Sequence, residues 1–408
     1  MAKVAVLGYG TVGSGVVEVL EKNRGLIEKR AGECLEVKYI LDLREFPGDP
    51  YEDKVIHDVN VILEDPEVQI VCETMGGNEP AFTFSKKALE AGKSVCTSNK
   101  ELVANHGAEL IALAKAHRCN YLFEASVGGG IPIIRPLNNA LTAERVEEIS
   151  GILNGTTNYI LTKMEKEGTD FSEALKKAQE LGYAERNPEA DVEGYDACRK
   201  IAILSCLMTG KTVDFKEVYT EGITKITPAD FSYAAKMNRT IKLLAMSALD
   251  GADGGGEPGC LAAVAPYLVS KDNPLAGVND VFNAVFVQSN MLGESMYYGK
   301  GAGKLPTASA VVADVVDCAK HAGRHIVCLW DEEKLHLEDF GRAKSRFFVR
   351  AEAAKEEEIT AVFGAVEKIS LNELPAEFGF VTEVMSEAEF AQKHEAVSGI
   401  ITRIRVKD

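Results

Sequence analysis

The chain of 408 residues has few of the features that would assign it to a membrane or to nucleic acid. It contains no apolar run near the roughly 20 residues that a helix needs to span a bilayer. Its first residues form a strand-like run and lack the basic and apolar regions of a signal peptide. Basic clusters are missing, and the formal net charge is −17. We therefore expect neither a membrane nor a nucleic acid as a partner.

Cysteine and histidine are poorly placed for redox or metal chemistry. The nine cysteines include no Cys-x-x-Cys pair, and the seven histidines show no metal-binding spacing. Several cysteines lie in apolar stretches, where a thiol behaves as a small hydrophobic group. We expect reduced, structural cysteines, a cytoplasmic location and no zinc site.

What is present is the composition of an ordinary globular protein. Hydrophobic residues make up 46% of the chain and charged residues 26%, which are close to average values. A length of 408 residues exceeds what one hydrophobic core usually supports. We therefore expect two or three domains.

The N-terminal residues follow the pattern of a dinucleotide-binding turn. An apolar strand over 3–7 runs directly into Gly8-Tyr-Gly-Thr-Val-Gly13, and a helical pattern covers about 12–30. In this context the spacing G-x-G-x-x-G lets the backbone approach a pyrophosphate at a helix N-terminus. A glycine turn in an unrelated α/β protein is the alternative. The predicted cofactor-binding residues of the turn are Gly8, Gly10, Thr11, Val12 and Gly13.

Two charged residues after the second strand bear on which nucleotide binds. A strand over 35–41 ends at Asp42, and Arg44 follows. A carboxylate there can bind the ribose 2′-hydroxyl of NAD, whereas an arginine can bind the 2′-phosphate of NADP. Both are present, so the choice stays open. Two further strands over 69–73 and 94–97, separated by a helix, indicate βαβ units and a parallel sheet.

A lysine lies at the start of the next predicted helix. Ser98 and Glu101 have the spacing of a capping box for a helix that reaches about residue 117. Lys100 then lies in the first turn, where the helix dipole disfavours a cation. We expect Lys100 to face a ligand at the end of the sheet; a solvated surface lysine is the alternative.

Two glycine-rich turns follow. After a predicted strand over 121–124, three glycines at 128–130 expose carbonyl groups, which can ligate a cation, crowd a cofactor or form a hinge. A later turn contains Gly303, where the backbone can approach a flat ring or an anion. It opens an apolar helix over 304–323, which is expected to pack back on the nucleotide-binding domain.

Asn154-Gly-Thr-Thr-Asn158 marks a turn followed by a helix. Thr156 or Thr157 is expected to cap this helix. The small polar side chains at its N-terminus can receive a substrate carboxylate. A plain capped helix is an equal alternative.

The most informative segment lies between residues 185 and 200. A carboxylate-rich loop with Glu185 and Asp191 leads into an apolar helix whose first turns carry Asp196 and Lys200. The last two are four residues apart and therefore share one helix face. A lysine held among carboxylates can bind the charged ends of an amino acid and transfer a proton. A surface salt bridge at a helix start is the alternative.

The far end of the chain changes character. Residues 346–408 predict strands and helices in the order βαββαβ, as in a small separate module. Residues 212–287 show strand-like alternation. The glycine-rich stretch 250–259 is expected to be an exposed hairpin tip without chemistry.

Six sequence motifs occur along the chain in a fixed order. They are Gly8–Gly13, Ser98–Lys100, Glu124–Ile131, Asn154–Asn158, Leu181–Lys200 and Gly301–Ser309. Together they make the chain resemble the homoserine dehydrogenase family over essentially its whole length. The resemblance implies reduction of L-aspartate 4-semialdehyde to L-homoserine by NAD(P)H, in the biosynthesis of threonine and methionine.

The resemblance also implies a domain plan. An α/β Rossmann domain would cover 1–130, an α+β catalytic and dimerisation domain 131–303, and an ACT-like regulatory module 346–408. The small-molecule substrate would bind to the second domain, and the chain would form a homodimer or homotetramer.

Roles for individual residues follow from the same resemblance. Lys200 would protonate the carbonyl oxygen as the hydride arrives, and Lys100 would lie between cofactor and substrate and assist in proton transfer. Glu185 would hold the substrate ammonium, with Asp191 and Asp196 lining the pocket. The carbonyl oxygens expected to hold a monovalent cation, such as a structural sodium ion, are those of Glu124, Val127, Gly129 and Ile131. The predicted substrate-binding residues are Glu185, Asp191, Thr156 and Asn154, and the predicted catalytic residues are Lys200, Lys100 and Asp196.

The sequence departs from the family in two places. Members that use NADP commonly carry an arginine directly before the acid that ends the second strand, where this chain has Leu41. The C-terminal module has residues 353–358 (Ala-Ala-Lys-Glu-Glu-Glu) in place of the Asp-x-x-Gly ligand turn of ACT domains. Arg44 can substitute for the missing arginine, so we expect dual or NAD-leaning cofactor use, and a poor response to threonine.

Two other functions fit part of this pattern. A reductase of another amino-acid aldehyde would share the architecture, but the segment from Glu185 to Lys200 argues against it. A regulatory protein that senses NAD(P) without turnover would keep the glycine turn. It would not need Lys100 and Lys200 as proton donors.

Overall fold

The computed structural model describes residues 1–250, 259–364 and 366–408, so the predicted hairpin tip lies almost entirely outside the described residues. The chain forms two compact units, each assembled from three stretches. Unit 1 contains residues 1–146, 202–215 and 289–335, and unit 2 contains residues 147–201, 216–288 and 336–408. The domain boundary predicted at residue 130 lies inside unit 1.

Unit 1 is built around a parallel sheet in the strand order β3-β2-β1-β4-β5-β6. This is the order of a dinucleotide-binding Rossmann fold, in which ligands bind at the carboxyl ends of the strands. The strands are β1 (Ala2–Leu7), β2 (Leu35–Leu41), β3 (Val55–Ile56), β4 (Val68–Glu73), β5 (Ser94–Thr97) and β6 (Tyr121–Leu122). β1, β4 and β5 are almost fully buried, as expected for strands covered by helices on both faces.

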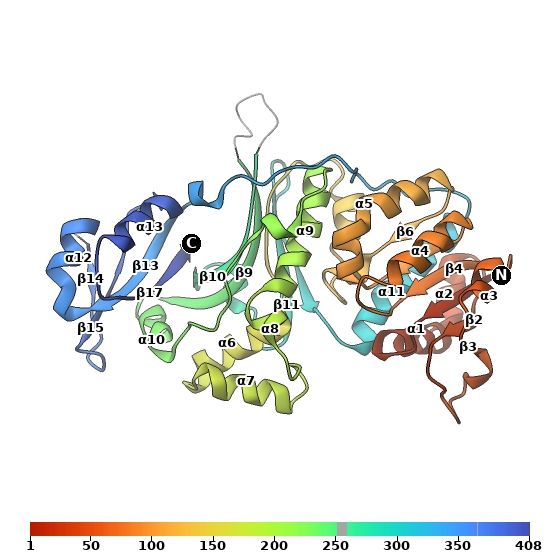
Figure 1. Cartoon of the computed structure of the whole chain (residues 1–408), viewed down its shortest axis with the longest axis horizontal. Helices are drawn as coiled ribbons and strands as arrows, with labels where there is room; N and C mark the ends of the chain where they lie inside the picture. Colours follow the sequence, from red (N-terminus) through yellow and green to blue (C-terminus); the bar gives the residue numbers. More distant parts are fainter. Residues whose placement is uncertain (251–258, 365) are drawn as a thin grey trace. The chain divides into compact units, whose positions relative to one another are not determined.

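Helices cover this sheet, and one of them comes from far along the chain. They are α1 (Thr11–Lys22), α2 (Arg24–Ala31), α3 (Asn60–Glu64), α4 (Ala81–Glu90), α5 (Lys100–Ala116) and α11 (Lys304–Lys320). Figure 1 shows α11 beside α1, and Val16 and Leu20 share an apolar core with Val311 and Val315. The single helix predicted over 12–30 is two helices, which break at Asn23.

Unit 2 contains a mixed sheet in the order β11-β7-β9-β10-β17-β13-β15-β14. Its strands are β7 (Val146–Ile152), β8 (Tyr219–Thr220), β9 (Arg239–Asp250), β10 (Gly259–Ser270), β11 (Phe282–Ser289), β13 (Lys344–Glu352), β14 (Lys368–Ile369), β15 (Glu377–Val381), β16 (Met385–Ser386) and β17 (Ile400–Lys407); β12 (Gly293–Lys300) follows β11 in the chain. The other helices are α6 (Gly155–Glu167), α7 (Phe171–Glu180), α8 (Glu189–Val192), α9 (Tyr195–Thr209), α10 (Pro228–Lys236), α12 (Glu356–Phe363) and α13 (Glu387–Glu395).

The C-terminal strand β17 lies in the interior of this sheet. It pairs in parallel with β10, where Tyr267 is opposite Arg405, and antiparallel with β13. Phenylalanines at 347, 378, 380 and 390 form an apolar core beneath β13 and β15. The order β13-α12-β14-β15-α13-β17, with the short β16 added, follows the predicted βαββαβ pattern.

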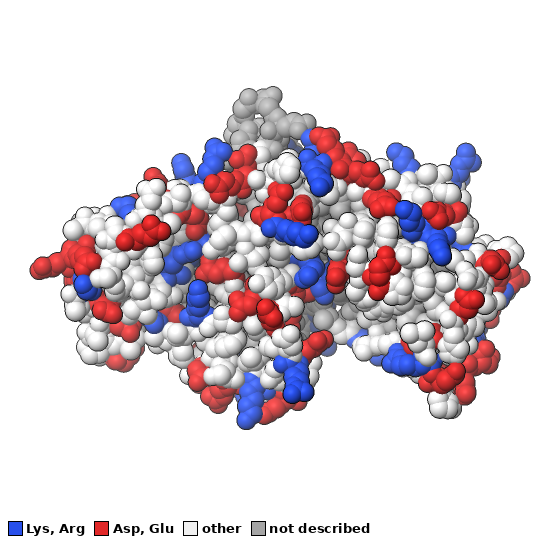
Figure 2. Space-filling view, in the orientation of Figure 1, with Lys and Arg blue, Asp and Glu red and all other residues white. Residues whose placement is uncertain are grey.

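Charged side chains of both signs lie on the surface of the described residues (Figure 2). On the face drawn in Figure 2, lysine and arginine side chains are interspersed with acidic ones and gather into no large basic area among the described residues. No helix in the described ranges has the length and apolar character to cross a bilayer. All nine cysteines are free thiols.

Candidate active site

The glycine turn between β1 and α1 has the close packing that a dinucleotide requires. Gly8 has φ +89°, and a Cβ atom on Gly13 would lie 1.9 Å from the carbonyl oxygen of Gly8. Apart from Gly10 and its two chain neighbours, no heavy atom of the described chain lies within 4 Å of a Cβ position built on Gly10. α1 begins at Thr11, directly after the turn, so its first N–H groups are presented to an anion. The turn therefore fits a pyrophosphate.

Asp42 and Arg44 form one charged group at the end of β2. The Asp42 carboxylate accepts hydrogen bonds from Tyr9 N at 2.8 Å and from Arg44 Nε and Nη2, both at 2.9 Å. The guanidinium holds the pKa of Asp42 well below its usual range. Both side chains line a pocket of ≈ 540 Å³ that also includes Gly8 and Gly10. The pocket presents one negative and one positive group to a ribose.

The helix that carries Lys100 is capped by a different residue from the one predicted. Asn99, not Ser98, is the N-cap of α5, because its side-chain oxygen accepts a hydrogen bond from Leu102 N at 3.1 Å. The predicted Ser98–Glu101 capping box is therefore wrong. Lys100 is the first residue of α5 and lies in its first turn, as predicted.

A buried carboxyl group that the sequence analysis missed lies beside this cap. Glu73 ends β4 and accepts hydrogen bonds from Thr97 Oγ1 at 2.5 Å and from Met75 N at 2.8 Å. Burial raises the pKa of Glu73. Thr97 Oγ1 also accepts a hydrogen bond from Asn99 N at 2.9 Å. The feature of the sequence that could have revealed Glu73 is a carboxyl group at the end of an apolar strand.

In unit 2, Asn154 joins the start of α6 to two carboxylates. Its side-chain oxygen accepts a hydrogen bond from Thr157 N at 2.9 Å, which makes Asn154 the N-cap. The prediction that Thr156 or Thr157 caps this helix is therefore wrong. The amide nitrogen of Asn154 donates to Asp191 Oδ1 at 2.7 Å and to Asp196 Oδ2 at 2.9 Å.

Lys200 and Asp196 pair on one face of α9, as their spacing predicts. Lys200 Nζ lies 2.7 Å from Asp196 Oδ2 and donates to the carbonyl oxygen of Leu153, also at 2.7 Å. The two side chains are only 11% and 9% exposed, so this is not a surface salt bridge. Two of the three N–H groups of the ammonium serve these acceptors.

The two remaining acids of this segment differ in environment. Burial raises the pKa of Asp191, with a further increase from the Asp196 charge that the Asn154 hydrogen bond opposes. Glu185 is exposed, and its carbonyl oxygen accepts a hydrogen bond from Gln179 Nε2 at 3.0 Å. The structure thus brings together Asn154, Asp191, Asp196 and Lys200, while Glu185 lies in the exposed segment after α7.

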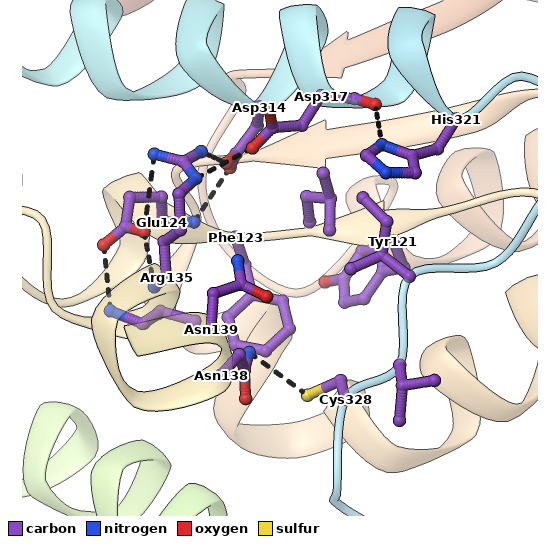
Figure 3. Close-up of a pocket in the computed structure, with 14 residues that line it drawn as sticks. Tyr121, Phe123, Glu124, Arg135, Asn138, Asn139, Asp314, Asp317, His321 and Cys328 are labelled. Carbon is purple, nitrogen blue, oxygen red and sulfur yellow. Dashed lines mark hydrogen bonds and ion pairs between the residues drawn. The ribbon is translucent and has the colours of Figure 1, made fainter. Parts of the chain in front are cut away.

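A second pocket in unit 1, of ≈ 200 Å³, lies beside the turn predicted to hold a cation. The buried Glu124 carboxylate accepts hydrogen bonds from the N–H groups of residues 133–135 at 2.6–2.9 Å. The Arg135 side chain reaches Asp314 at 2.6 Å and Asp317 at 2.8 Å (Figure 3). Burial raises the pKa of Asp314 well above its usual value. Arg135 and Asp314 are 179 residues apart in sequence, which is why no local pattern reveals this cluster.

The turn after Glu124 packs tightly on the second glycine turn. A Cβ atom on Gly129 (φ +56°) would lie 2.2 Å from the carbonyl oxygen of Gly301, and Gly303 (φ +123°) directly precedes α11. In the described residues, no group of three or more His, Cys, Asp or Glu side chains is arranged to hold a metal ion. The predicted sodium ligands are backbone carbonyls, which such a group does not include, so that site stays a prediction.

Comparison with known proteins identifies the family. A model of the homoserine dehydrogenase NAD-binding domain matches residues 8–124, and a homoserine dehydrogenase model matches residues 132–316. The homoserine dehydrogenase of Bacillus subtilis is 38% identical over 410 residues, which cover 95% of this chain and 93% of the relative. The chain belongs to the homoserine dehydrogenase family.

Further homoserine dehydrogenases agree. That of Synechocystis is 46% identical over 319 residues, 77% of this chain and 72% of the relative. The crystal structure of the Thiobacillus denitrificans enzyme has a TM-score of 0.90 at 34% identity, and covers 100% of this chain and 98% of that one. A hyperthermophilic archaeal homoserine dehydrogenase mutant, solved in complex with NADPH, has a TM-score of 0.65 at 30% identity and covers 78% of this chain and 97% of that one.

These matches confirm the predicted family, the predicted enzyme class and the predicted fold of the first two domains. The chain is an NAD(P)-dependent oxidoreductase of this family, with a Rossmann domain and a second domain built on a mixed sheet. They argue against a regulatory protein that binds NAD(P) without turnover.

Proposed function

We propose how this chain carries out the reaction of its family, the NAD(P)H-dependent reduction of L-aspartate 4-semialdehyde to L-homoserine. Lys200 is the acid that protonates the carbonyl oxygen. The observation that supports this role is a buried ammonium held by Asp196 and Leu153, with two donated hydrogen bonds at 2.7 Å. Such fixed geometry is what proton transfer requires.

When bound, NAD(P)H supplies a hydride to the aldehyde carbon. Negative charge develops on the carbonyl oxygen, and Lys200 neutralises it by donating a proton, which leaves a primary alcohol. Asp196 and the Leu153 carbonyl hold Nζ in place during this step. Lys100, in the first turn of α5, assists in the proton transfer.

The amino-acid end of the substrate carries an ammonium group and a carboxylate, and each needs a binding partner. Glu185 and Asp191 bind its ammonium group. Its carboxylate is received at the N-terminus of α6, next to Asn154 and Thr156, where helix N–H groups point outward. Both charged ends are thus fixed before the hydride arrives, which is how binding energy is turned into orientation.

The Lys200→Ala variant tests this role. We expect kcat for homoserine oxidation, followed by nicotinamide absorbance, to fall by at least about 100-fold, the usual worth of a general acid. The dissociation constant for NADPH is expected to stay unchanged. Lys177→Ala is the matched control, because Lys177 on α7 is 47% exposed and pairs with Glu167. Near-normal turnover by Lys200→Ala would overturn the assignment.

Cofactor choice depends on Asp42 and Arg44. Arg44 binds the 2′-phosphate of NADP, and Asp42 accepts a hydrogen bond from the ribose 2′-hydroxyl of NAD, so both cofactors are used. We expect Arg44→Ala to lower kcat/KM for NADP about tenfold and to leave that for NAD nearly unchanged. Asp42→Ala should shift the ratio toward NADP. Parallel assays with both cofactors give the ratio, and equal loss with both would refute the division of roles.

Three further features complete the proposal. The carbonyl oxygens of Glu124, Val127, Gly129 and Ile131 hold a structural sodium ion, which replacement of sodium by choline in the assay tests. The chain assembles as a homodimer or homotetramer, which sedimentation distinguishes. The ACT-like module is a poor threonine sensor, and strong inhibition by sub-millimolar threonine would refute that.

A further inference from the structure

We infer that Lys242 is a positioning residue that fixes the substrate-binding start of α6 through the loop over residues 278–282. Lys242 lies on β9 and has 0% exposure. The inference rests on the proposed binding of substrate at Asn154 and Thr156.

The buried ammonium is held by neutral oxygens. Lys242 Nζ donates to the carbonyl oxygen of Val278 at 2.6 Å and to Asn279 Oδ1 at 3.0 Å, and lies 3.5 Å from Asn158 Oδ1. Lysine is almost never fully buried unless it is paired, because removing the charge from water is costly. A methionine of similar length would fill this space without that cost, so the charge has a purpose other than packing.

The same loop is held from the α6 side. Asn158 Nδ2 donates its two N–H groups to the carbonyl oxygens of Asp280 and Phe282, both at 3.0 Å, and lies 3.3 Å from that of Val278. Asp280 N donates to Thr162 Oγ1 at 3.0 Å. Asp280 has a backbone φ of +57°, in the left-handed region that residues other than glycine seldom adopt. These hydrogen bonds from α6 therefore fix the conformation of the loop.

The loop in turn limits where α6 begins. A Cβ atom on Gly155 would lie 2.9 Å from the carbonyl oxygen of Val281, so the backbone of the loop lies directly against the first residue of α6. The preceding residue is Asn154, which bonds to both Asp191 and Asp196. A displacement of the loop therefore shifts the residues proposed to bind the substrate.

Lys242→Met is the test variant, and Lys93→Met is its matched control. Lys93 is also buried and donates to two carbonyl oxygens, those of Asp65 at 2.7 Å and Val68 at 2.9 Å. It precedes β5 in unit 1, at the amino edge of the sheet, away from the strand ends where a dinucleotide binds.

We expect Lys242→Met to raise KM for homoserine about tenfold, with kcat within about threefold of wild type and KM for NADP unchanged. Lys93→Met should change the thermal midpoint about as much as Lys242→Met does and leave KM for homoserine unchanged. A purely structural role for Lys242 would change only the thermal midpoint, and that result would overturn the inference. Gly155→Ala should also raise KM for homoserine, because its added Cβ atom pushes the Val281 backbone away from the start of α6. It keeps the inference testable if Lys242→Met does not fold.

The pH profile gives a second readout. Burial lowers the pKa of Lys242 to about 8, with Glu165 and Lys166 of α6 and Asp280 of the loop as the facing charges. The ammonium form holds the loop, so the advantage of wild type over Lys242→Met in kcat/KM for homoserine should be greatest below pH 8 and shrink above it. A constant ratio from pH 6.5 to 9.5 would contradict the role of the charge.

Asn154→Ala separates this inference from the proposal on which it rests. If Asn154→Ala leaves KM for homoserine unchanged, substrate does not bind at the start of α6, and both ideas fail. If it raises KM while Lys242→Met and Gly155→Ala do not, only the positioning role fails.

Discussion

One residue of the candidate site, Asp191, carries its charge at a cost in stability. Asp191 is half-buried and close to the Asp196 charge, and both effects favour its protonated form. Because its folded pKa is above the ordinary 3.8, its contribution to stability declines as pH rises from that value through the folded pKa. At neutral pH the charged form is therefore a burden on the fold that a bound ammonium would relieve.

The Asp191→Asn variant should separate these two effects. We expect a higher thermal midpoint at pH 7, because the buried charge is gone, and KM for homoserine about tenfold higher, because the ammonium loses a partner. The gain in stability over wild type should shrink as pH falls toward 3.8, the ordinary pKa of an aspartate, because the raised pKa of Asp191 lets the wild-type carboxyl group take up a proton. Calorimetry from pH 4 to 8 measures the first effect and initial rates the second. A midpoint below that of wild type at pH 7 would contradict the argument.

At this scale the sequence predicted contacts within a helix and missed contacts across the fold. Asp196 and Lys200 are four residues apart, so helical geometry alone places them together. Asn154 and Asp196 are 42 residues apart, and Lys200 and Leu153 are 47 apart. No local rule connects such pairs, so the bridging role of Asn154 emerged only from the structure.

Elements were predicted well where the signal was a run of apolar residues, and less well at their ends. β2 and β5 have the predicted bounds, 35–41 and 94–97. The caps of α5 and α6 were misplaced, because Ser, Thr and Asn are all good caps and the spacing favoured the wrong neighbour. The two-residue strand β8 left no pattern to detect.

Comparison of Asn99→Ala with Ser98→Ala tests the corrected cap of α5. Loss of an N-cap side chain costs about 1 kcal/mol, and Asn99 also donates to the carbonyl oxygen of Gly77 at 2.7 Å. We expect Asn99→Ala to lower the free energy of unfolding by about 1–2 kcal/mol and Ser98→Ala by less than about 0.5 kcal/mol. Urea unfolding followed by circular dichroism measures both, and the reverse order would restore the original capping box.

At the scale of the whole chain, segments that are far apart in sequence are joined within unit 2. In unit 2, Arg405 of β17 is 1% exposed and donates to Glu387 at 2.9 Å and to Glu221 at 2.8 Å. Glu221 precedes the loop in which Ile223 N donates to the Val192 carbonyl at 2.9 Å, next to the acids of the site. The C-terminal residues are thereby tied to the segment that carries Asp191.

Removal of this arginine should weaken unit 2. We expect Arg405→Met to cost about 3 kcal/mol, because two carboxylates lose a buried partner. Hydrogen exchange of amides in β10, β13 and β17 should accelerate while that in β1 and β2 stays unchanged. Arg346→Met is the control, since Arg346 pairs with Asp408 at the surface and such pairs contribute less than about 1 kcal/mol. Equal effects of both variants would mean that the burial of Arg405 contributes little.

The packing of α11 on α1 has a consequence for biosynthesis. About 280 residues separate the two helices, and a ribosome adds roughly 5–20 residues per second, so the interval between them lasts roughly 15–60 s. During that time Val16 and Leu20 have emerged, but their partners Val311 and Val315 have not yet been translated. For most of the synthesis of the chain, the N-terminal Rossmann segment thus exposes an apolar helix face whose packing partner is not yet made. Chaperones bind surfaces of this kind.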